Sequence, residues 1–112
     1  MKRCQQNSLA KTAYVRSAKI RQSARGESCT MNSPQCNYNP ETVVWCHSNF
    51  GEHGKGYGIK AHDMFGFYGC SACHYWLDIG TTASAEEKRF RFSLAHARSL
   101  LRLIEKGIVK VA

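Results

Sequence analysis

The stretch Tyr68–Asp78, YGCSACHYWLD, places two cysteines, a histidine and an aspartate close together in the chain. Cys70 and Cys73 have the Cys-x2-Cys spacing of a zinc knuckle. If a helix starts at this knuckle, His74 and Asp78 lie four residues apart on one helical face. The stretch can therefore serve one metal ion, two metal ions or none, and the remaining sequence has to decide between these alternatives.

The length and composition of the chain predict one folded domain. Its 112 residues, 43% of them hydrophobic, allow a modest core that needs a cross-link if much of the chain is loop. There is no apolar run of about 18 residues, and the start MKRCQQNS has no apolar stretch after its positive charges, so we expect neither a membrane span nor a secretory signal. In the cytoplasm that this implies, the six cysteines are expected to be metal ligands or free thiols.

Positive charge is concentrated at the N-terminus. The formal net charge is +8, and seven basic residues precede the first acidic residue: Lys2, Arg3, Lys11, Arg16, Lys19, Arg21 and Arg25. This basic arm, residues 1–26, predicts a polyanionic partner, above all nucleic acid. A solvated tail that only aids solubility is the alternative.

The first part of the chain predicts a helix followed by a loop. Residues 1–26 contain no Pro, and four apolar residues fall loosely on one side of a helix: Leu9, Ala13, Ile20 and Ala24. Ser8 is the candidate N-cap of this helix. Residues 28–40 are rich in Pro and Asn, which disfavour helix and central strand, so we expect a loop held by two cysteines.

The middle of the chain predicts two short strands around a long loop. Residues 41–47, ETVVWCH, have the β-branched and aromatic enrichment of a strand, and this strand ends at His47. Residues 48–60 are rich in glycine, which predicts an irregular loop. We expect the second strand around residues 57–62.

The last part predicts two helices and a terminal strand. The knuckle runs into a short helix that Gly80 ends. Ser84 and Glu87 form a capping box for a longer helix that Gly107 stops. The apolar residues at helical spacing predict its buried face: Phe90, Leu94, Ala97, Leu101 and Ile104. Residues 108–111, IVKV, predict a short strand.

Four cysteines predict a structural zinc site. Cys29 and Cys36 form a Cys-x6-Cys loop, and together with Cys70 and Cys73 they offer the four thiolates of a closed tetrahedral site. A redox dithiol is the alternative for Cys-x2-Cys, but such motifs follow a strand in a βαβ unit, whereas the segment here is FGFYG. Cys46 is expected to be a buried strand residue, and Cys4 an exposed thiol.

If zinc takes the cysteines, His74 and Asp78 are left to hold a second metal ion. A histidine and a carboxylate from one helix leave open positions for Mg²⁺, Mn²⁺ or a catalytic Zn²⁺, where a phosphate oxygen and a water can bind. The alternative is an ordinary surface pair, which this spacing also forms in many helices.

From Ala24 to Asp78 the chain resembles the HNH nucleases, also called His-Me finger or ββα-metal nucleases, in a zinc-stapled form. The shared features are a strand-ending histidine, a long glycine-rich loop, a polar residue, and Cys-x2-Cys-His opening a helix. The segments ARGESC, CNYNPETVVWCH and CSACHYWLD are also similar to a small family of phage and prophage proteins of unknown function that are regarded as nucleases.

The resemblance implies roles for individual residues. His47 would be the general base that activates water, and Asp63 would stand in the place of the middle Asn that orients this base. His74 would be the metal ligand on the helix, and Asp78 the further ligand one turn later. A purely structural histidine is the alternative for His47.

The chain departs from the family where many members carry an Asp or His ligand, because Cys46 precedes His47. Either Cys46 binds a softer ion such as zinc, or a residue such as His62 or Asp63 completes the shell, or more water does. His53 and His62 are otherwise expected to be solvated loop residues.

The sequence thus predicts an α+β fold: a basic arm over residues 1–26 and one HNH-like, zinc-stapled ββα-metal domain over residues 27–112 with a C-terminal helix. The predicted function is a metal-dependent DNA endonuclease in a bacterial host cell, acting in phage recombination or DNA processing. The predicted nucleic-acid contacts are Lys60, Arg16, Lys19, Arg21 and Arg25. The alternatives are a non-catalytic zinc-containing nucleic-acid-binding protein and a small scaffold for a host partner.

Overall fold

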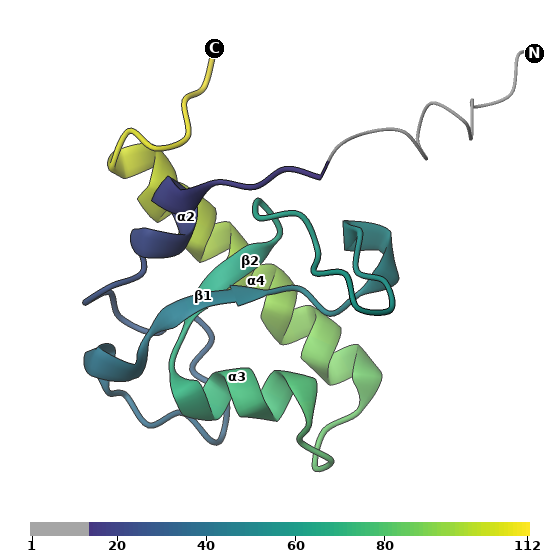
Figure 1. The fold of residues 1–112 in the computed structure, drawn as a ribbon. Helices are drawn as coiled ribbons and strands as arrows, with labels where there is room; N and C mark the ends of the chain where they lie inside the picture. The colour runs from purple at the N-terminus through teal and green to yellow at the C-terminus, as the bar shows by residue number, and fades with distance from the viewer. Residues whose placement is uncertain (1–13) are drawn as a thin grey trace, which may run out of the picture.

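The computed structural model of the protein describes residues 14–112, and they form a small α+β fold. A two-stranded sheet lies at its centre. In Figure 1 the long helix α4 (Ala85–Glu105) crosses behind the sheet, while α3 (Ser71–Asp78) and the short α2 (Ala18–Gln22) lie at its two ends. The α+β class is therefore confirmed. No helix among residues 14–112 is long and apolar enough to span a bilayer.

The sheet pairs two distant segments. Strand β1 (Val44–His47) runs antiparallel to β2 (Gly66–Gly69), and His47 lies opposite Gly66. Gly66 is required here, because a Cβ at this position would lie 2.5 Å from the indole nitrogen of Trp45. The pairing brings the end of β1 beside the chain that leads into β2.

Both strands differ from their predicted limits. The 3-10 turn η1 (Pro40–Thr42) takes up the start of the predicted first strand, since Pro40 suits the first position of a turn and donates no hydrogen bond to a sheet. The second strand is not at residues 57–62, where only an isolated bridge joins Gly56 to Ile59. It is the segment GFYG, whose glycines hide the alternation of a strand and whose residues are buried on both faces.

Helix α4 confirms the predicted N-cap, because the side chain of Ser84 accepts a hydrogen bond from the Glu87 N–H; the Glu87 carboxylate lies 3.7 Å from Arg91 and gives no reciprocal bond to Ser84. Its predicted buried face is wrong. Phe90 and Leu101 are 64% and 62% exposed. The buried residues lie on a different side of the helix: Phe92, Ala95, Ser99 and Leu103.

The choice of face follows from packing against β2. The Ser99 hydroxyl accepts a hydrogen bond from the Tyr68 N–H at 2.9 Å, so this helix position satisfies a buried donor of the sheet. The small side chain of Ala95, fully buried on the same side, allows the close approach. Apolar residues recur at helical spacing on both of these faces of α4, so periodicity alone does not show which face is buried.

The two ends of the chain also correct the predictions. Residues 108–111 form no strand, because the N–H groups of Ile108 and Val109 both donate to the Leu103 carbonyl and close the C-terminus of α4. In the N-terminal segment, Ile20 and Ala24 are buried as predicted. The described helix there begins after the N-cap Ser17. The earlier predictions for Cys4, Ser8, Leu9 and Ala13 lie outside the described residues.

Candidate active site and metal centre

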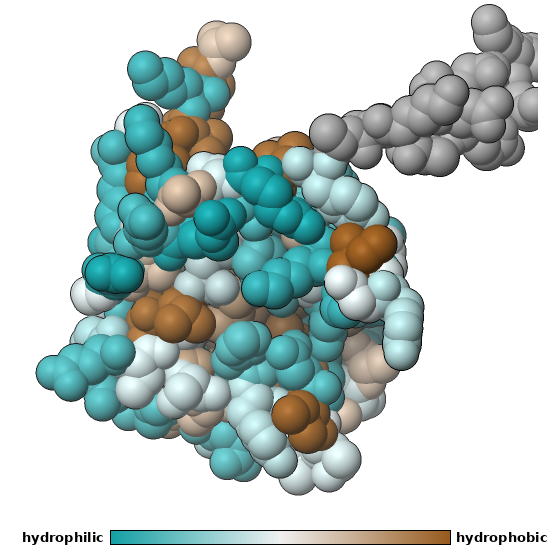
Figure 2. Space-filling view, viewed as in Figure 1, coloured by the Kyte–Doolittle hydropathy of each residue, from teal (hydrophilic) through white to brown (hydrophobic). Residues whose placement is uncertain are grey.

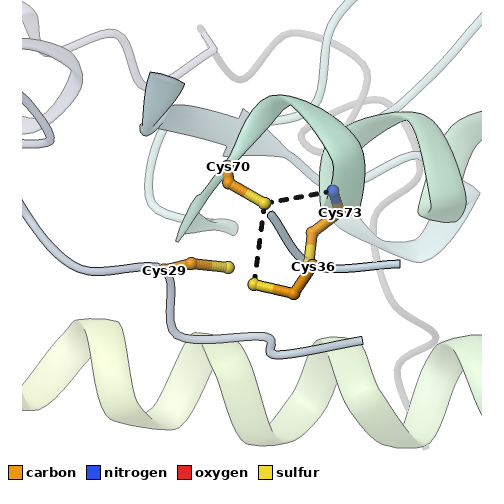
Figure 3. Close-up of side chains that lie close together, drawn as sticks. All are labelled: Cys29, Cys36, Cys70 and Cys73. Atoms are coloured by element: carbon orange, nitrogen blue, oxygen red, sulfur yellow. Dashed lines mark hydrogen bonds between the residues drawn. The ribbon is translucent and has the colours of Figure 1, made fainter. Parts of the chain in front are cut away.

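One loop and the start of α3 bring four cysteines together (Figure 3). The loop after α2 carries Cys29 and Cys36, Cys70 is the N-cap of α3, and Cys73 lies in its first turn. All four sulfur atoms lie within 4.8 Å of one another. Sulfurs around one tetrahedral zinc ion are about 3.8 Å apart, and the Cys36 and Cys70 sulfurs are 3.7 Å apart. The four cysteines can therefore hold a metal ion such as zinc.

Hydrogen-bond donors point at these sulfurs. The hydroxyl of Ser33 lies 3.1 Å and its N–H 3.4 Å from the Cys73 sulfur, and the Cys73 N–H donates to the Cys70 sulfur. The hydrogen bond between Cys73 and Cys29 lowers the pKa of Cys29 to about 4, while burial raises the pKa of Cys36 to about 11. The same hydrogen bond raises the pKa of Cys73. Thiolates are the form that binds metal, so metal binding would release the protons that these thiols hold.

Redox Cys-x2-Cys motifs follow a strand, and Cys70 does follow one, since the segment FGFYG contains β2. That strand belongs to an antiparallel hairpin and not to a βαβ unit. The two further cysteines beside Cys70 and Cys73 suit a closed metal site better than a two-cysteine redox centre.

Cys46 is a buried strand residue, as predicted. Its side chain is fully buried, and its sulfur lies 3.6 Å from the carbonyl oxygens of Val44 and Gly69. Burial raises the pKa of its thiol, so it remains protonated. It lies one residue from His47 on a strand, where neighbouring side chains point to opposite faces. Cys46 does not line the pocket described next.

A pocket of about 340 Å³ lies where β1, α2, α3 and the glycine-rich loop meet. It brings together five residues that the sequence analysis selected from distant segments: Arg21, His47, Lys60, His74 and Asp78. On the face shown in Figure 2, which is viewed as in Figure 1, hydrophilic side chains gather over α2 and the loops in front of the sheet. Two histidines, a carboxylate and cationic groups thus share one polar recess.

His47 is held by a buried carboxylate. Its Nε2 lies 2.6 Å from Oδ1 of Asp63, whose side chain is fully buried. The other carboxylate oxygen accepts hydrogen bonds from the Ser17 N–H and from Arg21, both at 2.5 Å. The Trp45 indole donates to the Asp63 carbonyl at 2.7 Å, which fixes the backbone as well. Asp63 therefore fixes the His47 ring and joins the start of α2 to β1 through its hydrogen bonds.

The electrostatics of Asp63 favour its charged form. Burial raises the pKa of this carboxyl, but the hydrogen bonds from His47, the Ser17 N–H and Arg21 outweigh burial and hold the pKa below its ordinary value. The charged carboxylate of Asp63 accepts a hydrogen bond from the Nε2–H of His47. In the neutral imidazole, Nδ1 is then the nitrogen with a free electron pair.

His74 and Asp78 form a second pair on α3. Nε2 of His74 lies 3.1 Å from Oδ2 of Asp78, and both side chains are partly exposed. The hydrogen bond to Asp78 raises the pKa of His74, and burial opposes this shift only in part. The predicted i to i+4 relation on one helical face is therefore present. The pair opens toward the pocket that also contains His47.

The remaining predicted residues lie outside this pocket. Arg16 donates to the carbonyls of Lys60 and Ala61 and so ties the N-terminal segment to the loop. Lys19 and Arg25 are exposed on the surface. They stay predicted nucleic-acid contacts, as do the charges of the arm before residue 14.

Two loop histidines are not the solvated residues that the sequence suggested. His62 accepts a hydrogen bond from the Val15 N–H at 2.9 Å and stacks on Tyr14, outside the pocket. His53 lies 2.6 Å from the Ser48 hydroxyl and stacks on Phe65. Neither completes a metal shell with His74 and Asp78. Ring stacking and side-chain hydrogen bonds across loops leave no short-range sequence signal.

Sequence reasoning missed four residues that line the pocket, and two of them, Lys55 and Asn49, bear on its chemistry. Lys55 lines it together with Lys60, and both come from the same glycine-rich loop. Asn49 also lines it and donates to Oδ1 of Asp78 at 3.3 Å. The available signal for Asn49 was its place two residues after His47 in the motif His-Ser-Asn.

The chain also matches a known protein family. The model of a family described as "Putative nuclease YbcO" matches residues 18–108. The chain belongs to this family. Its members' description implies nucleic acid as the substrate. The match starts at α2 and so includes the last part of the predicted arm; the division at residue 26 stays a prediction.

A solved structure supports the phage-type relationship. It is described as "Structure of a putative bacteriophage protein from Escherichia coli str. K-12 substr. MG1655" and is 30% identical in sequence. The similarity covers 80% of this chain and 100% of that chain, with a TM-score of 0.62. No curated protein matches the sequence significantly.

Proposed function

We propose that this protein is a metal-dependent endonuclease of the HNH type that hydrolyses phosphodiester bonds of DNA. One arrangement carries the proposal: His47, held by a buried carboxylate, faces the same pocket as the pair of His74 and Asp78. The order of β1, β2 and α3 along the chain is also the order of a ββα-metal module. The family description, a nuclease, agrees with this chemistry.

In the proposed mechanism His47 is the general base. Because Asp63 accepts the hydrogen bond from Nε2, Nδ1 takes a proton from a water molecule placed in line with the scissile P–O bond. Asp63 keeps the ring in position and stabilises the imidazolium that forms, as the carboxylate does in other histidine–carboxylate pairs. General-base catalysis of this kind contributes about 10²–10⁴ in rate.

His74 and Asp78 would hold the divalent ion, Mg²⁺, Mn²⁺ or Zn²⁺. An imidazole nitrogen and a carboxylate suit such ions, and the partly exposed pair is accessible from the pocket. When bound, the ion neutralises charge that develops on the phosphate and on the leaving oxygen. The zinc of the four-cysteine site would have a structural role only.

Cationic side chains would position the DNA backbone. Lys55 and Lys60 come from the glycine-rich loop, and Arg21 comes from α2, so phosphate contacts are available on two sides of the pocket. Such contacts carry no sequence information, so this part of the surface would bind DNA irrespective of sequence. We further propose a role in phage recombination or DNA processing; the description of the similar solved structure supports only the association with a phage.

The test is a cleavage assay with the zinc-loaded protein. Supercoiled plasmid and linear, single-stranded and branched DNA are incubated with Mg²⁺ or Mn²⁺ added in increasing concentration. Cleavage that requires the added ion supports the proposal. Salt-sensitive binding without cleavage of any DNA form would replace it with the non-catalytic nucleic-acid-binding function.

A further inference from the structure

The side chain of Asn49 contains an unsatisfied oxygen. Among residues 14–112, its amide Oδ1 is the one buried side-chain oxygen or nitrogen without a hydrogen-bond partner. Buried polar atoms in proteins are nearly always paired, so each exception calls for a ligand or another explanation. This oxygen belongs to a residue that lines the pocket with His74 and Asp78.

Asp78 stands between two neighbours. Its Oδ2 lies 3.1 Å from Nε2 of His74, and its Oδ1 lies 3.3 Å from the amide nitrogen of Asn49. Two ligand atoms on adjacent corners of an octahedral Mg²⁺ shell lie about 3 Å apart. In the structure it is the amide nitrogen of Asn49, not its unpaired oxygen, that faces Asp78. A half-turn of the amide exchanges the two atoms: the oxygen then lies beside Oδ1 of Asp78, where a cation can bridge the two oxygens, and the NH₂ group takes the buried position.

The backbone around Asn49 is already fixed. The Ser48 N–H donates to the Phe65 carbonyl at 2.8 Å, and the Phe50 N–H donates to the Ser48 hydroxyl at 3.0 Å. Both neighbours of Asn49 are therefore anchored, and its side chain is presented to the pocket without a need for loop ordering. Preorganised ligands of this kind favour metal binding.

His74 and Asp78 are only two protein ligands for the proposed divalent ion, and neither Cys46 nor Asp63 is available as a third. Cys46 points away from the pocket into the core, and Asp63 is occupied by His47, the Ser17 N–H and Arg21. An amide oxygen is a hard donor that Mg²⁺ and Mn²⁺ accept readily. We infer that Asn49 is a third protein ligand of the divalent ion held by His74 and Asp78, an inference that rests on the proposed function of this pocket.

The experiment measures binding of Mn²⁺ to the full chain loaded with one zinc ion, by the EPR signal of the free ion. Asn49→Leu keeps the size of the side chain and removes its oxygen, so it should weaken Mn²⁺ binding roughly tenfold or more. Asn49→Asp restores an oxygen ligand and should bind Mn²⁺ at least as tightly as the parent. Asn37→Leu, at an exposed site outside the pocket, is the matched control and should leave the affinity unchanged.

A second measurement detects the ligand atom directly. In protein prepared with asparagine that carries ¹³C at the side-chain carbonyl, the bound Mn²⁺ should show a ¹³C hyperfine coupling by ENDOR, and Asn49→Asp should abolish it. Bound Mn²⁺ without this coupling, Asn49→Leu with the affinity of the parent, or a parent that binds no Mn²⁺ would each overturn the inference.

The outcome is separable from that of the cleavage assay. If the parent cleaves DNA with Mn²⁺ and Asn49→Leu has unchanged Mn²⁺ affinity, the ligand assignment fails while the nuclease function stands. If Mn²⁺ binds with the predicted dependence on Asn49 but no DNA form is cleaved, the nuclease function fails while the ligand assignment stands.

Discussion

Nε2 of His47 and Oδ1 of Asp63 lie 2.6 Å apart, although 16 positions separate the two residues in the chain. The hydrogen bond joins the last residue of β1 to the segment that leads into β2, and it directs the other imidazole nitrogen away from the carboxylate.

Replacing His47 by Ala should lower cleavage by about 10²–10⁴ and leave DNA affinity near that of the parent, because a general base acts in the transition state. Asp63 keeps its hydrogen bonds from the Ser17 N–H and Arg21, so the fold should survive. Single-turnover cleavage rates, gel shifts and zinc content provide the measurements. Parent-like cleavage by this variant would exclude the assigned base.

Asp63→Asn should affect both stability and activity. The amide has about the same size, but if its NH₂ group faces the Ser17 N–H and Arg21, donors meet donors and a buried group is left unpaired at a cost on the order of 2 kcal/mol in unfolding free energy. If the NH₂ group faces His47 instead, the imidazole nitrogen there has to be an acceptor. This orientation favours the wrong imidazole tautomer, so cleavage should fall even where the variant is folded. Denaturant unfolding and cleavage rates are the two measurements. Asp63→Glu, which keeps the charge, should recover more activity than Asp63→Asn, and the reverse order would contradict the assigned role.

Ser substitutions of the four clustered cysteines should cost zinc and fold together, because metal binding at such sites supplies folding free energy of order 10 kcal/mol. The residues are Cys29, Cys36, Cys70 and Cys73. Cys46→Ala is the control, since Cys46 is buried in the core and is not one of the four clustered cysteines, and it should keep one zinc per chain. Elemental analysis and circular dichroism check both outcomes; parent zinc content in a cluster variant would refute the site.

Lys55→Ala and Lys60→Ala should each weaken DNA binding for all sequences alike. Each lost phosphate contact should reduce the slope of log K against log salt by about 0.9. Lys110→Ala removes an equal charge from the exposed C-terminal end and is the control for net charge. Fluorescence anisotropy at several salt concentrations gives the slopes. Equal slopes for all three variants would show that the loop does not contact DNA.

His53 should make stability depend on pH. Burial lowers the pKa of this imidazole below its ordinary value of 6.5; the charge of Glu52 opposes this shift, and the charges of His96 and Arg89 add to it. The unfolded chain therefore takes up a proton first as the pH falls. The contribution of His53 to the unfolding free energy is therefore fully present above pH 6.5. It is lost as the pH falls from 6.5 to the lower pKa of the folded state.

His53→Phe keeps a ring for stacking on Phe65 and removes the titration. Denaturant unfolding of the zinc-loaded protein between about pH 7.5 and 5.5 should show a smaller loss of stability for the variant than for the parent. An identical pH dependence in both proteins would assign the effect to other groups.

Much of the local structure could be predicted from the sequence because short-range chemistry determines it. The N-cap at Ser84, the stop at Gly107 and the Cys-x2-Cys start of α3 involve hydrogen bonds and dihedral angles within a few residues. The cysteine spacings likewise predicted the cluster, since four cysteines paired at short spacings suit a closed tetrahedral metal site. These features survive in the structure.

Tertiary packing decided the rest. The sequence offers two apolar faces on α4, and the buried N–H of Tyr68, which Ser99 satisfies, selects the one that packs on β2. The second strand lies in GFYG, where Gly66 has no Cβ that would clash with the indole of Trp45 on the paired strand. Both choices depend on contacts between residues far apart in the chain, and no local pattern encodes them.

For the site itself, the sequence by itself determined which side chains are available: His47, His74 and Asp78 stood out through their motifs. Only the tertiary structure decided that Asp63 is the buried partner of His47 and that Asn49 reaches Asp78. The physical reason is that a hydrogen bond or a shared ion requires atoms within about 3 Å, and the antiparallel pairing of β1 with β2 is what brings these separate segments to that distance.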